Sequence, residues 1–448
     1  MIRTVDSYNR LWACLRPFLS IYLTWRSLRG KEDHSRQEER FGQAWRRARP
    51  TGCLIWLHAV SAGESVAAIS LAKACLKLQG EAHILITTNT LTALEQLERT
   101  KPDQTIICYQ PLDHSAYVKR FLAYWQPDSA VFLESDFWPN LIIETARKNI
   151  IVHFASAQLS ATAFSNWKKR PELASTVFGA AQLICAVDDE QRQRFEQLCE
   201  SAIESPSDTE AVRKPEIRIG GSLKLNAVST AIDNTLVDQL RATAGGRPIL
   251  LAASTHEPEE QLLLQASQEA VRVGYPHLLI IAPRHIDRSQ NIARLMPQAA
   301  RRSKGQLPQS GDNYYLADSF GEMSSLVTAA DIVILGGSFA SKGGHNPLEI
   351  AALSTPLISG PSQFKNKAEF DRLQAYGQCV TVEDEASLVK QLNIWLETLR
   401  LHGRAVPKDN LDKACAYVKQ ACERPAKTAK LIINRLPAQR RPNQTEQQ

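Results

Sequence analysis

The sequence predicts an α/β protein with two doubly wound parallel sheets, each in its own domain. The chain has 448 residues, which is enough for two or three domains with separate cores. Hydrophobic residues make up 44% and charged residues 22%, which excludes a disordered or fibrous chain. Short apolar runs alternate with amphipathic stretches, and the alternation starts again in the second half. This pattern is typical of parallel sheets that helices cover on both faces.

The first 48 residues (1–48) predict a segment that lies on a membrane rather than across it. Residues 8–30 are rich in apolar and aromatic side chains, but Arg10, Arg16 and Pro17 interrupt them. The uncharged run at 17–25 is shorter than the roughly 20 residues that a spanning helix needs. Arg and Lys residues follow it, as in segments that lie at the interface of anionic lipids. The alternative is a helix that packs on the first domain.

Residues 49–220 are expected to form the first domain. Its strands are predicted at 53–58, 83–88, 105–109, 129–134, 151–155 and 182–187. Helical periodicity between them is clearest at 65–78, 115–125 and 190–199. The strand candidates are continuous apolar runs, which predicts burial on both faces. Residues 201–215 are polar and show no pattern, so an exposed loop is expected there.

Residues 221–425 repeat the pattern and are expected to form the second domain. Strands are predicted at 249–253, 278–282, 314–317, 332–335 and 356–359, and helices at 258–272, 287–295, 347–353, 367–376 and 386–399. A last helix is predicted at about 410–436, so that 426–448 hold its end and a polar tail. Ligands of such sheets bind at the carboxyl ends of the strands, so a cleft between the domains is expected.

Three polar residues are placed to act at such an edge. Glu64 stands at a helix start, after a strand and a turn of small residues, and could accept a proton from an attacking hydroxyl. Its alternative role is to stabilise the helix N-terminus. Glu134 ends a buried strand, where Ser135 or Asp136 could cap the next helix. Lys224 follows a pair of glycines between the two halves and could stabilise negative charge.

Two segments of the second domain predict contacts with a nucleotide. Pro283 and Arg284 end an apolar strand, and arginine binds phosphate through two parallel hydrogen bonds. Gly321, followed by Glu322 and Met323, leaves backbone N–H groups open near a helix start. The alternatives are a surface arginine and a plain strand-to-helix turn.

The longest glycine-rich segment reads GGSFASKGGHNPLE at 336–349. Asn346 can cap a helix that begins at Pro347. Leu348 and Glu349 then lie in the first turn, where the carboxylate can reach a ribose diol. Backbone N–H groups and the helix dipole would attract phosphate. The spacing fits neither the Walker A motif nor the G-x-G-x-x-G fingerprint.

Motifs for several other chemistries are missing from the sequence. It has no D-x-D pair for a nucleotide-bound metal, no H-E-x-x-H and no G-x-S-x-G nucleophile elbow, so a site without metal or cofactor is expected. Nine scattered cysteines without a C-x-x-C pair predict a reducing compartment. The net charge of +6 permits an acidic ligand or an anionic membrane but does not call for nucleic acid.

Taken in order, these segments resemble the bacterial 3-deoxy-D-manno-octulosonic acid (Kdo) transferases of lipopolysaccharide assembly. The similarity spans most of the chain, from residue 40 to the C-terminal helix. Its most specific parts are HAVSAGE at 58–64, ESDFWPN at 134–140, STHE at 254–257, PRH at 283–285 and GGHNPLE at 343–349. The resemblance implies a glycosyltransferase of the GT-B type, with two Rossmann-like domains that face a central cleft.

The resemblance also implies the reaction. An inverting, metal-independent enzyme would move Kdo from CMP-Kdo to a lipid A precursor (lipid IVA) at the cytoplasmic face of the cell inner membrane. Residues 49–220 would bind the acceptor, and residues 221–425 the CMP-sugar. Glu64 matches the family's general base, and Glu134 and Lys224 match positions that stabilise the transition state. The CMP-binding positions are matched by Pro283, Arg284, Gly321, Glu322, Met323, Asn346, Pro347, Leu348 and Glu349.

Several positions depart from the family pattern. Ala93 stands where glycine is usual, and GPSQFKN at 360–366 replaces the usual Gly-Pro-His-x-x-Asn-Phe. Gln158 and Thr162 stand where arginines are usual, and Asn226 stands where aspartate is expected. The loss of cationic and polar groups bears on acceptor choice or rate more than on the fold. Two alternatives therefore stay open. One is a related GT-B transferase with another CMP-activated ulosonic acid or another lipid acceptor, and the other is a membrane-associated binding protein without turnover.

Overall fold

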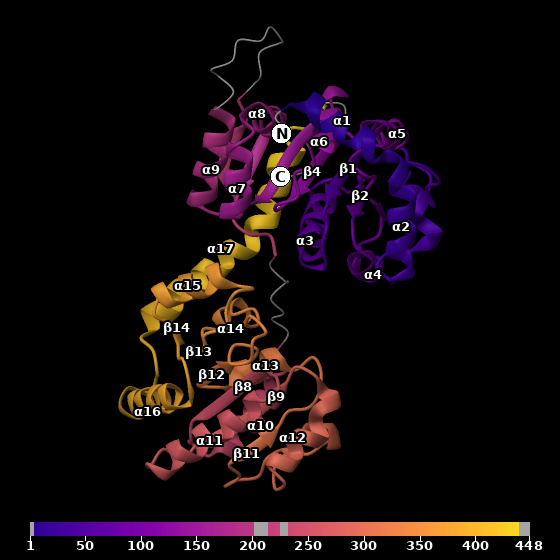
Figure 1. Cartoon of the computed structure of the whole chain (residues 1–448). Helices are drawn as coiled ribbons and strands as arrows, with labels where there is room; N and C mark the ends of the chain where they lie inside the picture. The colour runs from indigo at the N-terminus through magenta and orange to yellow at the C-terminus, as the bar shows by residue number, and fades with distance from the viewer. Residues whose placement is uncertain (1–3, 201–213, 225–231, 439–448) are drawn as a thin grey trace. The chain divides into compact units, whose positions relative to one another are not determined.

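The computed structural model describes residues 4–200, 214–224 and 232–438 of the chain. Two compact units result from its internal contacts. Residues 1–227 and 421–448 form the first unit, and residues 228–420 form the second. Figure 1 follows the chain through both units from the N-terminus to the C-terminus.

The N-terminal segment folds into two short helices joined by a 3-10 turn. α1 (Val5–Leu15) begins after Thr4, whose hydroxyl accepts the N–H of Ser7. η1 (Arg16–Phe18) leads into α2 (Leu19–Leu28), and η2 (His34–Phe41) follows. Among the residues that the structure describes, no helix is long and apolar enough to cross a bilayer.

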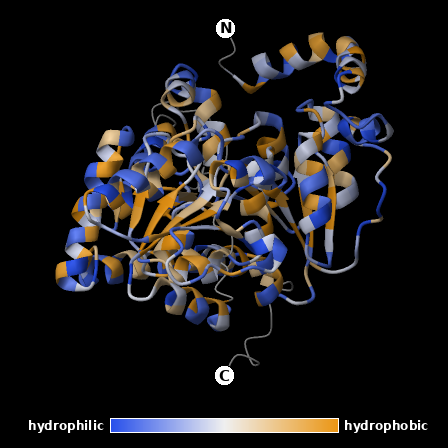
Figure 2. Ribbon diagram, turned by 90° about the horizontal axis from the view of Figure 1, so that it is seen from below, coloured by the Kyte–Doolittle hydropathy of each residue, from blue (hydrophilic) through white to orange (hydrophobic). Residues whose placement is uncertain are grey.

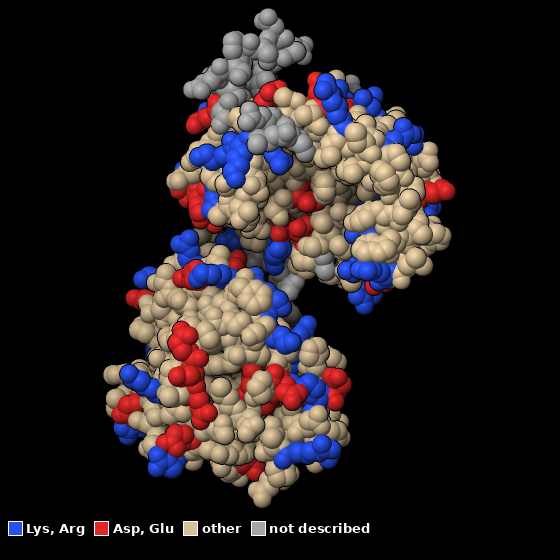
Figure 3. Space-filling model, in the orientation of Figure 1, with Lys and Arg blue, Asp and Glu red and all other residues tan. Residues whose placement is uncertain are grey.

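Apolar side chains of α1, η1 and α2 point into solvent. Phe18, Ile21 and Leu28 are 62%, 68% and 85% exposed, whereas Leu23 is buried. The same helices also expose Leu11, Leu15, Tyr22 and Trp25. The face that carries α2 is largely tan in Figure 3, with blue Lys and Arg groups above and below it. Residues of both helices bind this segment to the first unit. In α1, Tyr8 donates to Asp113 at 2.7 Å and Val5 packs against the core, and in α2 Leu19 and Leu23 are buried.

The first unit holds a parallel sheet of seven strands in the order β3-β2-β1-β4-β5-β6-β7. The strands are β1 (Leu54–His58), β2 (His83–Thr88), β3 (Thr105–Tyr109), β4 (Ser129–Leu133), β5 (Ile151–Ala157), β6 (Leu183–Ala186) and β7 (Glu216–Ile219). The chain runs outward from β1 to one edge and from β4 to the other. The switch point of this doubly wound sheet therefore lies between β1 and β4, where such folds bind ligands.

Helices cover both faces of this sheet. They are α3 (Ala62–Leu78), α4 (Leu91–Thr100), α5 (Ser115–Trp125), α6 (Pro139–Arg147), α7 (Ala161–Lys168), α8 (Pro171–Gly179), α9 (Asp189–Glu200) and the end of α17 (Lys408–Ile433). Consecutive residues of β1 belong to different hydrophobic cores, one on each face of the sheet. Trp56 packs with α5 and α6, and Leu57 packs with α3 and the end of α17. Figure 2 shows the strands mostly in the hydrophobic colour and the helices in mixed colours.

The second unit holds another parallel sheet, in the order β10-β11-β9-β8-β12-β13-β14. Its strands are β8 (Ile249–Thr255), β9 (Leu278–Pro283), β10 (Ala300–Arg301), β11 (Tyr314–Leu316), β12 (Ile332–Leu335), β13 (Leu357–Ser359) and β14 (Cys379–Thr381). Its helices are α10 (Asn234–Ala244), α11 (Glu259–Arg272), η3 (Ile286–Arg288), α12 (Ser289–Leu295), η4 (Arg302–Lys304), α13 (Met323–Ala329), α14 (Leu348–Ala351), α15 (Lys367–Ala375) and α16 (Glu385–His402). Here the switch point lies between β8 and β12.

These two parallel sheets confirm the predicted GT-B fold class. All eleven predicted strands are present, with ends that differ by at most two residues. Three short strands were not predicted: β7, β10 and β14. The predicted helix at 347–353 is wrong in length, because α14 keeps only Leu348–Ala351 and turns follow it. Most of the predicted loop at 201–215 lies outside the described residues.

Candidate functional site

Glu64 lies in the first turn of α3, directly after the carboxyl end of β1. Its Oε2 accepts the N–H of Val60 at 2.5 Å and of Ser61 at 3.3 Å, while its own N–H donates to the Ser61 hydroxyl. This capping box holds the carboxylate in place. Burial raises the pKa of Glu64, the Val60 hydrogen bond opposes the rise, and the charge of Glu134 adds to it. Among the described residues, the hydrogen bonds that Glu64 accepts as a helix cap all go to Oε2. Capping the helix and accepting a proton are therefore compatible roles for this side chain.

Glu134 directly follows β4, across the switch point from Glu64. Its backbone is left-handed, with φ +61°, which is uncommon and costly for any residue other than glycine. Its Oε2 lies 2.6 Å from Lys224 Nζ and accepts the Gln158 side-chain N–H at 3.1 Å. Its buried Oε1 has no hydrogen-bond partner in the described structure. Backbone strain and an unpartnered buried oxygen together are typical of a functional site.

Lys224 is brought to the same place. A side chain added at Gly63 would lie 3.7 Å from Lys224 Cε, so the ammonium group reaches the turn before Glu64. The three predicted catalytic residues Glu64, Glu134 and Lys224 thus meet at the switch point of the first sheet. Gln158, one of the departures from the family pattern, belongs to this cluster, whereas Thr162 is exposed on α7. Asn226 lies outside the described residues.

Asp136 and Asp113 organise the loops around this cluster. Asp136 accepts the indole N–H of Trp138 at 2.5 Å and lies 3.4 Å from His58 Nε2. The prediction that Ser135 or Asp136 caps the next helix is wrong, because α6 begins at Pro139 after Trp138 without a side-chain cap. Asp113 instead accepts the backbone N–H groups of Asn140 and Leu141, at 3.1 and 2.7 Å.

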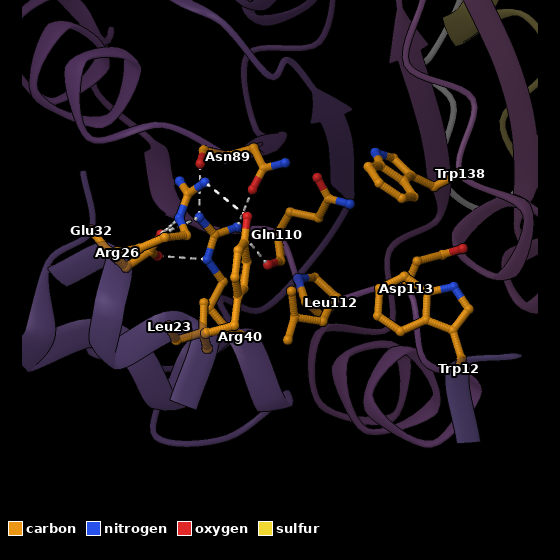
Figure 4. A pocket seen from close by; sticks show the side chains of 12 residues that line it. Trp12, Leu23, Arg26, Glu32, Arg40, Asn89, Gln110, Leu112, Asp113 and Trp138 are labelled. Atoms are coloured by element: carbon orange, nitrogen blue, oxygen red, sulfur yellow. Dashed lines mark hydrogen bonds and ion pairs between the residues drawn. The ribbon is translucent and has the colours of Figure 1, made fainter. Parts of the chain in front are cut away.

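A cavity of about 180 Å³ lies at this edge of the first sheet, between α1, α2 and the loops after β2, β3 and β4. Figure 4 shows the guanidinium groups of Arg26 and Arg40 on one side and the rings of Trp12 and Trp138 on the other. Gln110 stands between them, and its buried Oε1 has no partner in the described structure. The cavity thus offers aromatic surface beside an unused polar atom.

In the second unit, Arg284 follows the carboxyl end of β9 and is exposed. Its backbone N–H donates to the Thr255 carbonyl at 3.1 Å, which fixes the start of its loop. Burial raises the pKa of Glu349, and the positive charge of Arg284 opposes this rise. Asn346 accepts the N–H of Leu348 at 3.1 Å, but the predicted cap and helix start are wrong, because α14 begins at Leu348 with Pro347 as its N-cap and has no side-chain cap. With a single helical turn there, the dipole contributes little.

In the segment 321–323, the carboxylate of Glu322 pairs with an arginine side chain that the sequence did not identify as its partner. Gly321 has φ +87°, a conformation that favours glycine. Glu322 forms an ion pair with Arg302 at 2.5 Å and accepts the hydroxyl of Ser319, so its pKa is lowered. Met323 begins α13. Glu322 therefore organises this loop, and its backbone rather than its carboxylate is left to contact a ligand.

Comparisons with known proteins identify the family of this chain. Residues 35–209 match a family model described as 3-deoxy-D-manno-octulosonic-acid transferase (kdotransferase). A 3-deoxy-D-manno-octulosonic acid transferase of Haemophilus influenzae is 31% identical over 363 residues, which cover 80% of this chain and 82% of that protein. The Bordetella pertussis protein of the same name is 32% identical and covers 73% and 76%. A probable mitochondrial 3-deoxy-D-manno-octulosonic acid transferase of Arabidopsis thaliana is 31% identical and covers 79% and 78%.

This likeness extends over both units and over the segments that supply Glu64, Glu134 and Arg284. The chain therefore belongs to the 3-deoxy-D-manno-octulosonic acid (Kdo) transferase family of glycosyltransferases.

Proposed function

We propose that this enzyme transfers Kdo from CMP-Kdo to a hydroxyl of a lipid A precursor, lipid IVA, with inversion and without a metal. One observation carries the proposal: the Glu64, Glu134 and Lys224 cluster occupies the ligand-binding switch point of the first sheet. Membership of the family is the reason to propose Kdo as the transferred sugar. The resemblance of the CMP-binding segments is the reason to propose CMP-Kdo as the donor.

In the proposed reaction Glu64 accepts the proton of the attacking hydroxyl. The acceptor oxygen then forms its bond to the anomeric carbon, and the electron pair of the breaking bond stays on the phosphate oxygen of CMP. One displacement from the opposite face inverts the anomeric centre. The Lys224–Glu134 ion pair holds a positive charge beside Glu64, where it stabilises the charge that develops on the acceptor oxygen.

A second candidate is a related transferase that uses another CMP-activated ulosonic acid or another lipid acceptor. It is supported by the place of Gln158, which donates to Glu134 Oε2 where the family usually has an arginine. A neutral amide leaves this cluster with one positive charge fewer. Product analysis with alternative donors and acceptors separates the two candidates.

We further propose that α1 and α2 attach the enzyme to the cytoplasmic face of the inner membrane. Replacing Phe18, Ile21 and Leu28 together with serine is expected to lower binding to phosphatidylglycerol-containing vesicles about tenfold or more, because these side chains are the most exposed large apolar groups of α1, η1 and α2. Co-sedimentation with the vesicles measures the effect. A matched triple variant at exposed apolar residues of the second unit, Val273, Ile394 and Leu401, is expected to bind as the wild type does. Equal loss in both variants would contradict the assignment.

The donor site is tested by CMP itself. Arg284→Met is expected to weaken CMP binding about 10- to 100-fold, because a charge-assisted hydrogen bond to phosphate contributes about 1.5–3 kcal/mol. Isothermal titration calorimetry measures the affinity. Arg294→Met, at another exposed arginine of the second unit, is the control and should bind CMP normally. Wild-type affinity in Arg284→Met would remove Arg284 from the site.

A further inference from the structure

Three histidines lie at the carboxyl ends of neighbouring strands in the second unit, and none of them was assigned a role above. His256 follows β8, His285 follows β9, and His345 stands in the loop after β12. The sheet order β9-β8-β12 makes these three loops neighbours, and β8 and β12 flank the switch point. The ring centroid of His256 lies 5.1 Å from that of His345 and 5.5 Å from that of His285. The imidazoles therefore form one cluster where a doubly wound sheet binds its ligand.

His256 and His345 form a hydrogen-bonded pair. Their Nε2 atoms lie 2.9 Å apart, and the two rings are within 6° of parallel. One ring must donate and the other accept, because two Nε2–H groups cannot face each other at this distance. The pair can gain one proton at the free Nδ1 of the donating ring without losing this hydrogen bond. A second added proton would break it.

A buried carboxylate positions the pair. Glu259, which is 1% exposed, accepts the backbone N–H groups of His256 and Gly337 at Oε2, both at 2.8 Å. Its Oε1 accepts the N–H of Phe339 at 2.9 Å. Gly337 has φ +69°, and a Cβ there would lie 3.1 Å from His345 Cδ2, so only glycine leaves room for the ring. The two loops and their histidines are therefore fixed relative to each other.

Cations surround the pair. The charged and titratable groups that act on one or both rings are Arg284, His285, Arg288, Lys342 and Lys365, together with the carboxylate of Glu259. Burial, then His256, and then Arg284, Lys365 and His285 lower the pKa of His345 to about 4, and burial lowers that of His256. Glu349 faces Arg284 at the same edge. Near neutral pH the pair is therefore uncharged among several fixed positive charges.

We infer that the phosphate of a nucleoside monophosphate binds against this cluster and that the His256–His345 pair takes up one proton as the phosphate binds. An anion beside the rings offsets the repulsion from Arg284 and the lysines and favours the protonated pair. The added charge would stabilise the electron pair left on the phosphate oxygen when its bond to the sugar breaks. This inference rests on the proposed CMP-sugar site and adds a proton-linked step to it.

Proton uptake can be measured on the full-length wild-type enzyme. CMP is titrated calorimetrically at pH 7.5 in buffers that differ in ionisation enthalpy, and the slope of the observed enthalpy gives the protons bound. Between roughly half a proton and one proton per CMP is expected, and CMP affinity should fall by up to about tenfold per pH unit above neutrality. Cytidine, which lacks the phosphate, should bind without proton uptake.

Three variants assign the proton. A His256→Gln/His345→Gln double variant, whose amides can replace the Nε2 hydrogen bond but cannot titrate, should bind CMP with no proton uptake. Glu349→Gln removes the competing carboxylate. It should bind CMP more weakly, but each CMP that binds should still bring the proton. His402→Gln, at an exposed histidine of α16, is the matched control and should behave as the wild type does. The wild-type measurement stands even where a variant fails to fold.

The possible outcomes separate this inference from the proposed function. CMP binding without proton uptake in the wild type would overturn the inference and leave the donor assignment intact. Uptake that survives in the His256→Gln/His345→Gln double variant would also overturn it, since another group, such as the Glu349 carboxylate or the phosphate itself, would then be the proton acceptor. If CMP does not bind at all, the donor assignment fails and the inference fails with it.

Discussion

Glu64→Gln is expected to lower the rate of sugar transfer about 10²- to 10⁴-fold, because general base catalysis contributes this much in enzymes. Glutamine keeps a carbonyl oxygen that can accept the Val60 and Ser61 N–H groups, so the capping box of α3 should persist. CMP affinity should not change. The measurement is kcat at saturating donor, with CMP binding as the check on folding.

Glu95→Gln is the matched control, because Glu95 is an exposed carboxylate on α4 of the same unit. A Glu64→Gln enzyme with the rate of this control would show that Glu64 only caps the helix. The pH profile gives a second readout. A base must be ionised, so the rate should fall as the pH drops through the pKa of Glu64. Since burial raises that pKa, the fall should begin above the usual range of a glutamate.

Arg40→Met is expected to lower the free energy of unfolding by about 3–5 kcal/mol, the usual cost of breaking a buried ion pair. Arg40 is 1% exposed, and its Nε donates to Glu32 at 2.7 Å. Its Nη1 donates to the Asn89 side chain at 2.6 Å, and its guanidinium lies over the ring of Tyr109, 4.3 Å from the centroid. Methionine would remove two hydrogen bonds from the buried Glu32 carboxylate, which would keep its ion pair with Arg26 at 3.0 Å. Denaturant unfolding measures the change.

Arg99→Met is the control for this substitution. Arg99 is exposed at the end of α4, and surface substitutions usually change stability by less than about 0.5 kcal/mol. If both variants unfold at the same denaturant concentration, the contacts of Arg40 with Glu32, Asn89 and Tyr109 do not stabilise the first unit. A loss confined to Arg40→Met would show that η2 is bound to the sheet through this side chain.

Most of the fold could be predicted because the buried strands carry an unambiguous pattern. β1 and β9 are continuous apolar runs, and each strand of this kind was found from the sequence. β7 was not, because its residues are half-buried or exposed and include Glu216 and Arg218 at a sheet edge. β10 and β14 lie at the two edges of the second sheet, and of their residues only Cys379 is fully buried, so neither forms a buried apolar run. Edge strands owe their structure to neighbours that the sequence does not show.

The candidate site was predictable only where a residue ends a strand or begins a helix. Glu64, Glu134 and Arg284 were found in this way. The His256–His345 pair was not, because 89 residues separate its members and only the order of β8 and β12 brings them together. Gln158 was noted as a departure, but its hydrogen bond to Glu134 depends on the pairing of β4 with β5.

One transfer assay tests the central claim, which is that this chain moves Kdo from CMP-Kdo to a lipid A precursor. Purified enzyme, CMP-Kdo and tetraacylated lipid A precursor are mixed in EDTA, and the lipid products are weighed by mass spectrometry beside Glu64→Gln. The lipid is expected to gain the mass of one or more Kdo units with the wild-type enzyme and at most a trace with the variant. The gain should occur in EDTA, that is, without a metal ion. Folded wild-type enzyme that binds CMP yet adds no Kdo to this lipid would contradict the central claim.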